Sequence, residues 1–530
     1  MQAYIARLLT GLGMFCLVAG SAQAQLAQNL TIGNPKAMAL GNAITADSSG
    51  IDAVHYNPAA LTKLKGRQTQ MKLLTGVMDI RAKFDAPAGY GSNFFGYSDD
   101  DVAGKSSRTT TPAMYLPGFG GITEMPVLAA PLAGMSINPP GSKFTFATNM
   151  YAPQALGFSR DDDDDPARYQ GRKVAIQRIT YLSPSVAYQM NDELSFGLSV
   201  GFSHQAMALN QDFRAPGTLT GVTQLFGEIF KSGICATPIV ILVNFCGAEL
   251  GPFTNLANLD IDLQQKLAPS WNVGVLWEPT DWFAWGATYQ SESRMHLQGK
   301  YTVDYSSNWQ SFWSTFNSAL LPQFVPIFPN GNVDEERGSA SLDLTYPDHF
   351  STGIKFKPHD QWQINFDLKW TDYADWNEFT IEFDRELDML RIAKVFSPNA
   401  ATSNSITLDR GYESVWSWAL GVQYDVNERL SLRAGYEPRP SSIPGNKADV
   451  LAPVGDATLY GLGLGYRWDK DTYIDLGFNY FVSEQDIPAG TSCNVNCASL
   501  DSLVYNPYAD LNVKTKTTAY IMAVTYRTTF

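Results

Sequence analysis

Residues 520–530, YIMAVTYRTTF, alternate between apolar and polar side chains and end on an aromatic residue. Successive side chains of an extended strand point to opposite faces, so this stretch has one apolar face and one polar face. The apolar face carries Tyr520, Met522, Val524, Tyr526 and Phe530. A strand like this at the open edge of a soluble sheet would invite aggregation. The stretch therefore indicates a strand that belongs to a larger, paired sheet.

The same alternation recurs at 362–370, 416–424 and 462–468. Trp and Tyr gather at the ends of these segments, as in the interfacial girdles of membrane barrels. In a soluble sandwich, the alternative, the aromatic residues would be scattered over an internal core. The pattern favours an all-β fold, a transmembrane antiparallel β-barrel.

The composition agrees with strands that face lipid. Aromatic residues make up 12% of the 530 residues, charged residues only 17%, and Gly is frequent. The formal charge of −14 argues against a nucleic-acid partner, because phosphate binding needs clustered Lys and Arg and the sequence has no such cluster. We also expect no cofactor and no metal site. The run 161–165, DDDDD, is read as a solvated loop, with binding of Ca²⁺ or bridging to lipopolysaccharide through divalent ions as the alternative.

The connections alternate between short and long. Short turns are predicted at 190–193, 278–281, 358–360, 425–428 and 469–471, and long loops near 85–106, 152–173, 210–262, 304–338, 385–408, 438–455 and 485–508. Outer-membrane barrels alternate short periplasmic turns with long extracellular loops. The count gives about fourteen strands, with the last strand closing the barrel beside the first one near 67–80, because an open edge in lipid leaves backbone groups unsatisfied. We expect a monomer in the bacterial outer membrane.

The N-terminus has the features of a secretory signal. Arg7 precedes an apolar run at 8–20, and residues 22–24, AQA, give a small-x-small cleavage pattern, so residues 1–24 are predicted to be removed. The mature chain keeps Cys235, Cys246, Cys493 and Cys497, an even number in an exported protein. We expect two local disulfides, Cys235–Cys246 and Cys493–Cys497; a zinc site is the competing interpretation.

Residues 25–66 do not follow the strand pattern and contain YNPAAL at 56–61. This motif resembles the NPA signature of the FadL-type outer-membrane transporters of long-chain fatty acids and other hydrophobic compounds. Further similar pieces are WNVGVLW at 271–277, YQSE at 289–292, NDELSFGL at 191–198, and LRAGY at 432–436 followed by PSSIP. The resemblance implies a hatch inside the lumen at 25–66, with Asn57, Pro58 and Ala59 as hatch residues, and a barrel at 67–530. We also expect contact with outer-membrane lipid and lipopolysaccharide, and Phe530 looks like the terminal signal read by the barrel assembly machinery.

Two long loops carry apolar residues at helical spacing. Such surface must be covered by other loops or must bind a hydrophobic ligand. The resemblance favours a groove that captures acyl chains before they pass through the hatch and leave sideways at a kink in the third strand. The predicted ligand-binding residues are Leu225, Phe226, Ile229, Trp309, Trp313, Phe316 and Leu320.

The head-group site is not obvious from the sequence. The strand after Phe202 offers His204 and Gln205 where an Arg would suit a carboxylate, so His204 is added to the ligand-binding residues. The third strand, near 143–147, lacks the glycine that the family pattern associates with the kink. No nucleophile motif accompanies the five scattered His residues, so we predict a transporter and not an enzyme. An aromatic hydrocarbon channel, an exporter of the same fold and a structural or adhesive barrel are the alternatives.

Overall fold

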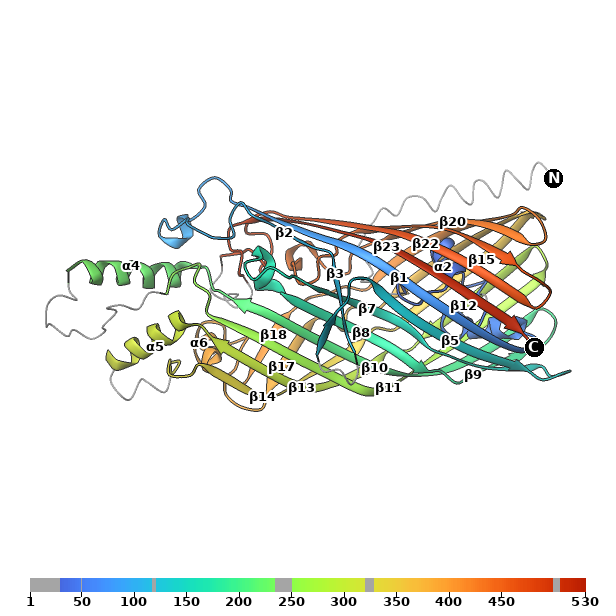
Figure 1. Cartoon of the computed structure of the whole chain (residues 1–530), viewed down its shortest axis with the longest axis horizontal. Helices are drawn as coiled ribbons and strands as arrows, with labels where there is room; N and C mark the ends of the chain where they lie inside the picture. The colour runs from blue at the N-terminus through green and yellow to red at the C-terminus, as the bar shows by residue number, and fades with distance from the viewer. Residues whose placement is uncertain (1–28, 49, 117–120, 234–249, 320–327, 499–505) are drawn as a thin grey trace.

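The computed structural model describes residues 29–48, 50–116, 121–233, 250–319, 328–498 and 506–530. The strands form a closed antiparallel barrel of 14 strands, as predicted. In Figure 1 short turns and the C-terminus lie at one end, and long connections with helices α4, α5 and α6 lie at the other. Among the described residues, no helix is both long enough and apolar enough to cross a membrane.

Several barrel strands are interrupted and therefore comprise two labelled elements. Residues 66–305 contribute β1 (Gly66–Asp85), β2 (Ser106–Thr109), β3 (Thr111–Tyr115), β4 (Ile122–Glu124), β5 (Leu128–Asn138), β6 (Phe144–Asn149), β7 (Tyr151–Ser159), β8 (Lys173–Leu182), β9 (Ser185–Gln189), β10 (Leu194–Phe213), β11 (Ala257–Thr280), β12 (Phe283–Gln290) and β13 (Ser293–Tyr305). Residues 335–529 contribute β14 (Glu335–Tyr346), β15 (His349–His359), β16 (Trp362–Thr371), β17 (Glu378–Phe383), β18 (Ser405–Asp409), β19 (Val415–Asp425), β20 (Leu430–Arg439), β21 (Ala457–Arg467), β22 (Thr472–Ile487) and β23 (Asn512–Thr529).

The last strand closes the barrel against the first one, as the C-terminal stretch predicts. The β1–β23 ladder runs antiparallel from Gln68 opposite Thr529 to Asp85 opposite Asn512. On its other side β23 pairs with β22 along nearly its whole length. Closure satisfies the backbone groups that an open edge would leave without partners in lipid.

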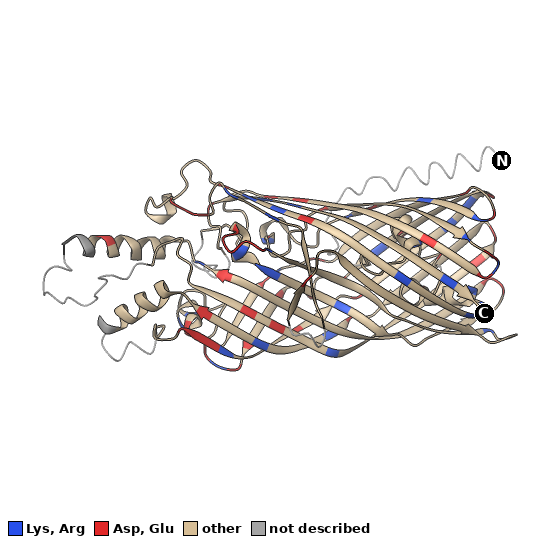
Figure 2. Cartoon of the chain, in the orientation of Figure 1, with Lys and Arg blue, Asp and Glu red and all other residues tan. Residues whose placement is uncertain are grey.

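The outer face of the wall carries a band of exposed apolar side chains that would face lipid. Tyr520, Met522 and Val524 are exposed, whereas Ile521 and Ala523 between them face inward and are buried. An aromatic row crosses five neighbouring strands, with adjacent ring centroids 5.2 to 6.2 Å apart, and comprises Trp418, Tyr436, Tyr460, Tyr480 and Tyr520. Aromatic rows of this kind lie at membrane interfaces. The charged residues of the wall and loops are shown in Figure 2.

Residues 29–65 lie inside the barrel wall. They form α2 (Pro35–Ala39), α3 (Ala53–Tyr56) and the 3-10 helix η1 (Pro58–Lys63). Helix α2 packs against β20, β21 and β22, and η1 packs against β9, β10 and β11. Asn57 caps η1 by accepting a bond from Ala59 N at 3.1 Å, and Pro58 takes the first position of that helix, where a missing N–H costs nothing.

Glycines on the inner wall make room for this segment. An added Cβ at Gly197 or Gly435 would lie 2.1 Å from backbone atoms of Pro58 or Gly41. Equivalent overlaps within 3.0 Å arise at Gly274, Gly286, Gly421, Gly461 and Gly477. These contacts come from seven strands, β10, β11, β12 and β19 to β22, so the segment is in close contact with much of the wall.

A hairpin outside the wall has no counterpart among the predicted elements. After β2, the chain forms β3 and β4, and only then enters the wall again as β5. The backbone N–H of Tyr115 in β3 donates to the Gln177 side-chain oxygen of β8, and the Gln177 amide nitrogen donates to the Tyr115 carbonyl. The Tyr115 side chain packs on Ala175, Ala206 and Ala208. These three alanines alternate with residues whose side chains face the lumen, so the hairpin covers the outer face of β8 and β10.

Candidate functional site

The loop half of the lumen is lined by a continuous apolar cluster. It joins inward residues of β10, β11, β13, β14 and β17 to the loop helices, and includes Leu263, Met295, Leu297, Leu344 and Phe379. Outward residues on the same strands, such as Asp260 and Lys300, are exposed and charged. The side chains therefore turn an apolar surface toward the inside of the barrel at this level, where a water-filled porin is polar.

Helix α5 (Ser307–Ala319) joins this cluster, so the helical spacing predicted for it is correct. Trp309, Phe312 and Trp313 are 3%, 3% and 6% exposed, and Phe316 is partly buried. Trp313 stacks on Phe328 with ring centroids 6.0 Å apart. Trp309 and Trp313 thus pack loop against loop, whereas Leu320 lies outside the described residues. Helix α6 (Asp388–Phe396) adds Leu390 to the same cluster.

Helix α4 (Thr218–Gly233) differs because its apolar side chains are exposed. Phe226 and Ile229 are 44% and 49% exposed, and Leu225 is partly buried. The helix projects beyond the barrel wall at the loop end (Figure 1). Cys235, Cys246 and the apolar stretch 239–245 follow it and lie outside the described residues. Exposed apolar residues that stand together at a barrel mouth suit a first contact with a hydrophobic ligand.

A buried arginine lies below the apolar cluster. Arg178 of β8 lines a narrow cavity of about 10 Å³, room for roughly one water molecule, together with Met207, Met295, Leu344 and Tyr346. Its guanidinium donates to Ser270 Oγ at 2.7 Å and to Ser203 Oγ at 3.3 Å. Its Cζ lies 4.4 Å above the Tyr346 ring. No Asp or Glu of the described chain forms an ion pair with it.

A buried cation without a carboxylate partner is costly in a protein interior. Arg178 is 7% exposed and is held by neutral hydroxyls and an aromatic face. A planar guanidinium can bind a carboxylate through two parallel hydrogen bonds. The cavity is therefore suited to the head group of an apolar carboxylate, once the flexible Met207 and Met295 move aside.

Arg178 was not among the predicted residues, because the head-group site was expected on the strand after Phe202. The structure places His204 elsewhere: its Nε2 lies 3.2 Å from Gln264 Oε1 and its ring stacks on Tyr115 of the outer hairpin. Gln205 faces Arg178 in the β8–β10 ladder, beyond a bulge at His204. Arg178 has the same side-chain orientation as Val174 and Ile176, which point into the lumen. A charged residue at an inward position of this strand was the sequence signal that could have predicted it.

The wall has a gap at the third barrel strand. This strand breaks at Met150, between β6 and β7, although it lacks the glycine associated with a kink. The β5–β6 ladder covers only 134–137 and 146–149, and β7 pairs with β8 and, at its far end, with β3. In the described chain no ladder joins β7 to the upper part of β5.

The N-terminal residues cover this gap from inside. Asn29 N donates to Pro153 O at 3.0 Å and Thr31 Oγ1 donates to Ala152 O at 2.8 Å. The His55 ring packs against the Tyr151 ring, with centroids 4.9 Å apart. All three contacts are made by the first residues of β7, directly after the break. An opening toward the membrane at this point therefore requires residues 29–31 to move.

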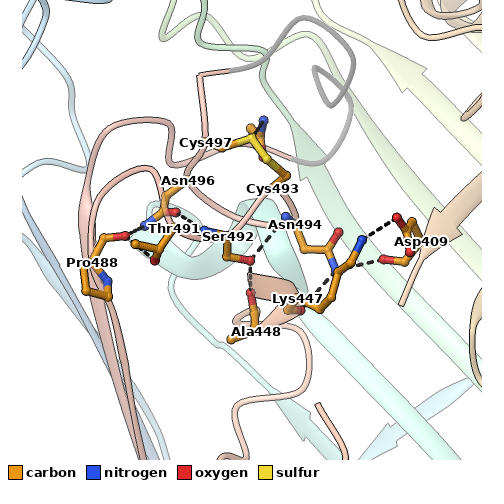
Figure 3. Close-up of a disulfide and its surroundings, with 11 residues drawn as sticks. Asp409, Lys447, Ala448, Pro488, Thr491, Ser492, Cys493, Asn494, Asn496 and Cys497 are labelled. Carbon is orange, nitrogen blue, oxygen red and sulfur yellow. Dashed lines mark hydrogen bonds and ion pairs between the residues drawn. A yellow bond between two sulfur atoms is a disulfide. The ribbon is translucent and has the colours of Figure 1, made fainter. Parts of the chain in front are cut away.

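Loops cover the barrel mouth above the apolar cluster. Arg214, which follows β10, is fully buried and donates to Asp100 Oδ1 at 2.6 Å and to Pro507 O at 2.7 Å. Burial alone would raise the pKa of Asp100, but the Arg214 guanidinium more than offsets this and lowers it below 3.8. Cys493 and Cys497 form a disulfide in the same region, beside Asn494, which donates to Asp409 O and Lys447 O (Figure 3).

Comparisons with known proteins agree with this architecture. The chain is 22% identical over 441 residues to the long-chain fatty acid transport protein of Escherichia coli O6:H1, covering 83% of this chain and 85% of that one. It is 23% identical over 479 residues to outer membrane protein P1 of Haemophilus influenzae, with 88% of each chain covered.

Among solved structures, a Pseudomonas aeruginosa FadL homologue matches 96% of this chain and 100% of its own, with a TM-score of 0.66 and 17% identity. The Pseudomonas putida toluene transporter TodX matches 94% of this chain and 99% of its own, with a TM-score of 0.59 and 16% identity. These likenesses support the fold. A sequence model of one family matches residues 15–530, and the chain therefore belongs to the outer membrane protein transport proteins (OMPP1/FadL/TodX).

Proposed function

We propose that this protein carries long-chain fatty acids, or similar apolar carboxylates, across the outer membrane by passive binding and diffusion. The observation that carries the proposal is Arg178, a buried cation with hydroxyl and aromatic neighbours at the bottom of an apolar lumen. A purely apolar cargo would give no reason to keep a charge there, because burying it is costly. The relative from Escherichia coli named as a fatty acid transport protein is consistent with this cargo.

Capture begins at the loop end of the barrel. The exposed Phe226 and Ile229 of α4, with Leu225 beside them, are the first apolar contacts of an incoming chain. Each methylene that leaves water contributes about 0.8 kcal/mol, so long chains are retained and short ones escape. On α5 the partly buried Phe316 is the next apolar contact, and the buried Trp309 and Trp313 support it from the packed loops. His204 supports the outer hairpin in this proposal and does not contact the ligand.

The hatch is the segment 29–65, within the predicted hatch at 25–66. Once the carboxylate binds Arg178, the residues that cover the gap between β5 and β7 must be displaced for the ligand to leave sideways. Asn57, Pro58 and Ala59 form a rigid turn at the start of η1, which fixes the position of the segment against the wall. Lateral exit keeps an apolar molecule out of the aqueous periplasm.

A second cargo class is aromatic hydrocarbons, because solved neighbours include the toluene transporter TodX. Such a ligand would use the apolar cluster but would accept no charge-assisted hydrogen bond from Arg178. The two cargoes therefore differ in their dependence on one side chain.

The assembly machinery and lipid complete the proposed partners. Phe530 is 71% exposed next to the closing seam, where a recognition factor could reach it. We propose a monomer, because the β1–β23 ladder closes the barrel within a single chain.

The test is native mass spectrometry of the purified barrel with oleate, methyl oleate and toluene, for the wild type and for Arg178→Gln. The matched control is Arg294→Gln, because Arg294 is a wall arginine that is 85% exposed and paired with Glu292. We expect Arg178→Gln to weaken oleate binding about tenfold or more, the range of a lost charge-assisted pair, and to leave methyl oleate and toluene unchanged. Equal oleate binding in both proteins would overturn the head-group assignment, and toluene binding without oleate binding would move the function to hydrocarbons.

A further inference from the structure

A cluster of cations lies on the outer wall at the closing seam. Side chains of Lys516, Arg81 and Arg108 occupy facing positions on β23, β1 and β2. Two residues nearer the loops, Lys83 faces Lys514. All five side chains are 50 to 61% exposed and line a shallow groove over β22, β23, β1 and β2. We call these five residues the seam patch. In Figure 2 Lys and Arg are visible on the strands that Figure 1 labels β1 and β23.

The arrangement opposes like charges directly. Arg81 faces a cation on each side, and Lys83 faces a third one, so the seam patch has three cross-strand pairs of equal charge. Such pairs destabilise a sheet. Four carboxylates accompany them, Asp79, Asp85, Glu484 and Asp486, each within 3.0 Å of a cation. Exposed ion pairs contribute little, and five cations against four carboxylates leave one positive charge in excess.

The height of the seam patch on the wall indicates what it faces. Val77 is opposite Tyr520, and both are exposed to the lipid at the level of the aromatic row. Arg81 and Lys516 lie four residues nearer the loop end than Val77 and Tyr520, a distance of about 13 Å along a strand. The seam patch therefore lies just outside the hydrocarbon boundary, at the level of lipid head groups in the outer leaflet.

We propose that the seam patch binds the phosphate groups of lipopolysaccharide, the phosphorylated glycolipid of that leaflet. Clustered Lys and Arg next to a membrane boundary recognise anionic head groups. Arginine offers a planar fork that matches a phosphate, and each lysine ammonium has three donors, of which the carboxylate pairs use a part. A bound phosphate offsets the repulsion across the strands and clamps β1, β2 and β23 together at the seam. This proposal does not depend on the cargo.

The experiment uses the full chain in detergent, with bisphosphorylated and dephosphorylated lipid A as probes in native mass spectrometry. The variant is Arg81→Gln/Lys83→Gln/Lys514→Gln. The matched control removes three exposed cations elsewhere, Lys143, Arg294 and Lys470, by the same substitution. We expect the seam variant to bind bisphosphorylated lipid A about fivefold or more weakly than the wild type, since several charge-assisted hydrogen bonds are lost. The control should bind it like the wild type.

Two results would overturn the proposal. Equal binding of dephosphorylated lipid A would show that phosphate recognition is absent, and displacement of lipid A by millimolar inorganic phosphate would make the site one for free anions. Heat-modifiable migration reports whether each variant folds. If the triple variant does not fold, Arg108→Gln on the short β2 replaces it, with at least a twofold weaker binding expected and unchanged binding counting against the seam patch.

Discussion

Asn149, the last residue before the break in the third barrel strand, donates its side-chain amide to the Asp52 carboxylate at 2.7 Å. The same fully buried carboxylate accepts from three further side chains, which are Asn34, Gln70 and Lys72. One aspartate thus joins the luminal segment to β1 at the seam and to β6 at the gap. Lys72 also donates to Ile32 O at 2.9 Å. Ile32 directly follows residues 29–31, which cover the gap from inside.

Asp52→Asn should release residues 29–34 from the wall. The substitution leaves the Lys72 ammonium buried without its carboxylate, a local cost of about 3 to 5 kcal/mol. Hydrogen exchange of residues 29–34 should accelerate by orders of magnitude, while exchange along β23 stays unchanged. Asp52→Asn/Lys72→Met removes both charges and should recover part of the protection. Unchanged exchange in the single variant would mean that Asp52 does not hold the segment.

Gly435→Val should displace the luminal segment without opening the seam. A Cβ at Gly435 would lie 2.1 Å from Gly41 N, and the neighbouring wall cannot yield because its backbone is hydrogen bonded on both sides. Overpacking of this kind costs about 1 to 3 kcal/mol. Conductance in planar bilayers should rise relative to the wild type. The control is Gly445→Val, where nothing lies within 4 Å, and equal conductance of the two variants would contradict the prediction.

The barrel was predictable because strand alternation and turn chemistry are local signals. The strand character of β1 and β23, the helical spacing of α4 and α5, and the short turns follow from residues close together in the sequence. The pairing of β1 with β23 follows from the need to close a barrel in lipid. The outer hairpin β3–β4 was not predicted, because short strands that dock on a wall from outside have no periodic signature.

The proposed head-group residue was not predicted, for a different reason. Arg178 is defined by contacts to Ser203, Ser270 and Tyr346 on other strands, and no local motif announces them. The break at Met150 likewise occurs without a glycine, since it is set by pairing partners on either side. The burial of Trp309 and Trp313 depends on which loops pack over α5. Each of these features is set by contacts between residues distant in the sequence.

Acid should loosen the loops over the mouth through Asp100. Because its pKa is lowered in the folded protein by Arg214, Asp100 stabilises the folded loops at pH values above its unfolded pKa, and this contribution is lost as the pH falls below about 4. Cleavage within 86–105 by an acid-active protease should therefore be faster at pH 3 than at pH 5. These two pH values lie about one unit on either side of the pKa of Asp100 in the unfolded chain. Asp100→Asn should be cleaved readily at both pH values. A wild-type cleavage rate that is independent of pH would contradict this role.

Capture and packing can be separated on the two loop helices. Phe226→Glu/Ile229→Glu alters side chains that are about half exposed, so the loops should stay folded while oleate capture weakens about tenfold, as expected when exposed apolar area is lost. Trp313→Glu instead places a charge where the side chain is 6% exposed, and should unfold α5 and its neighbours. Binding of a fluorescent fatty acid measures capture, and hydrogen exchange of 307–319 measures folding. Normal capture by the α4 variant, with α5 protected, would exclude α4 as the entry surface.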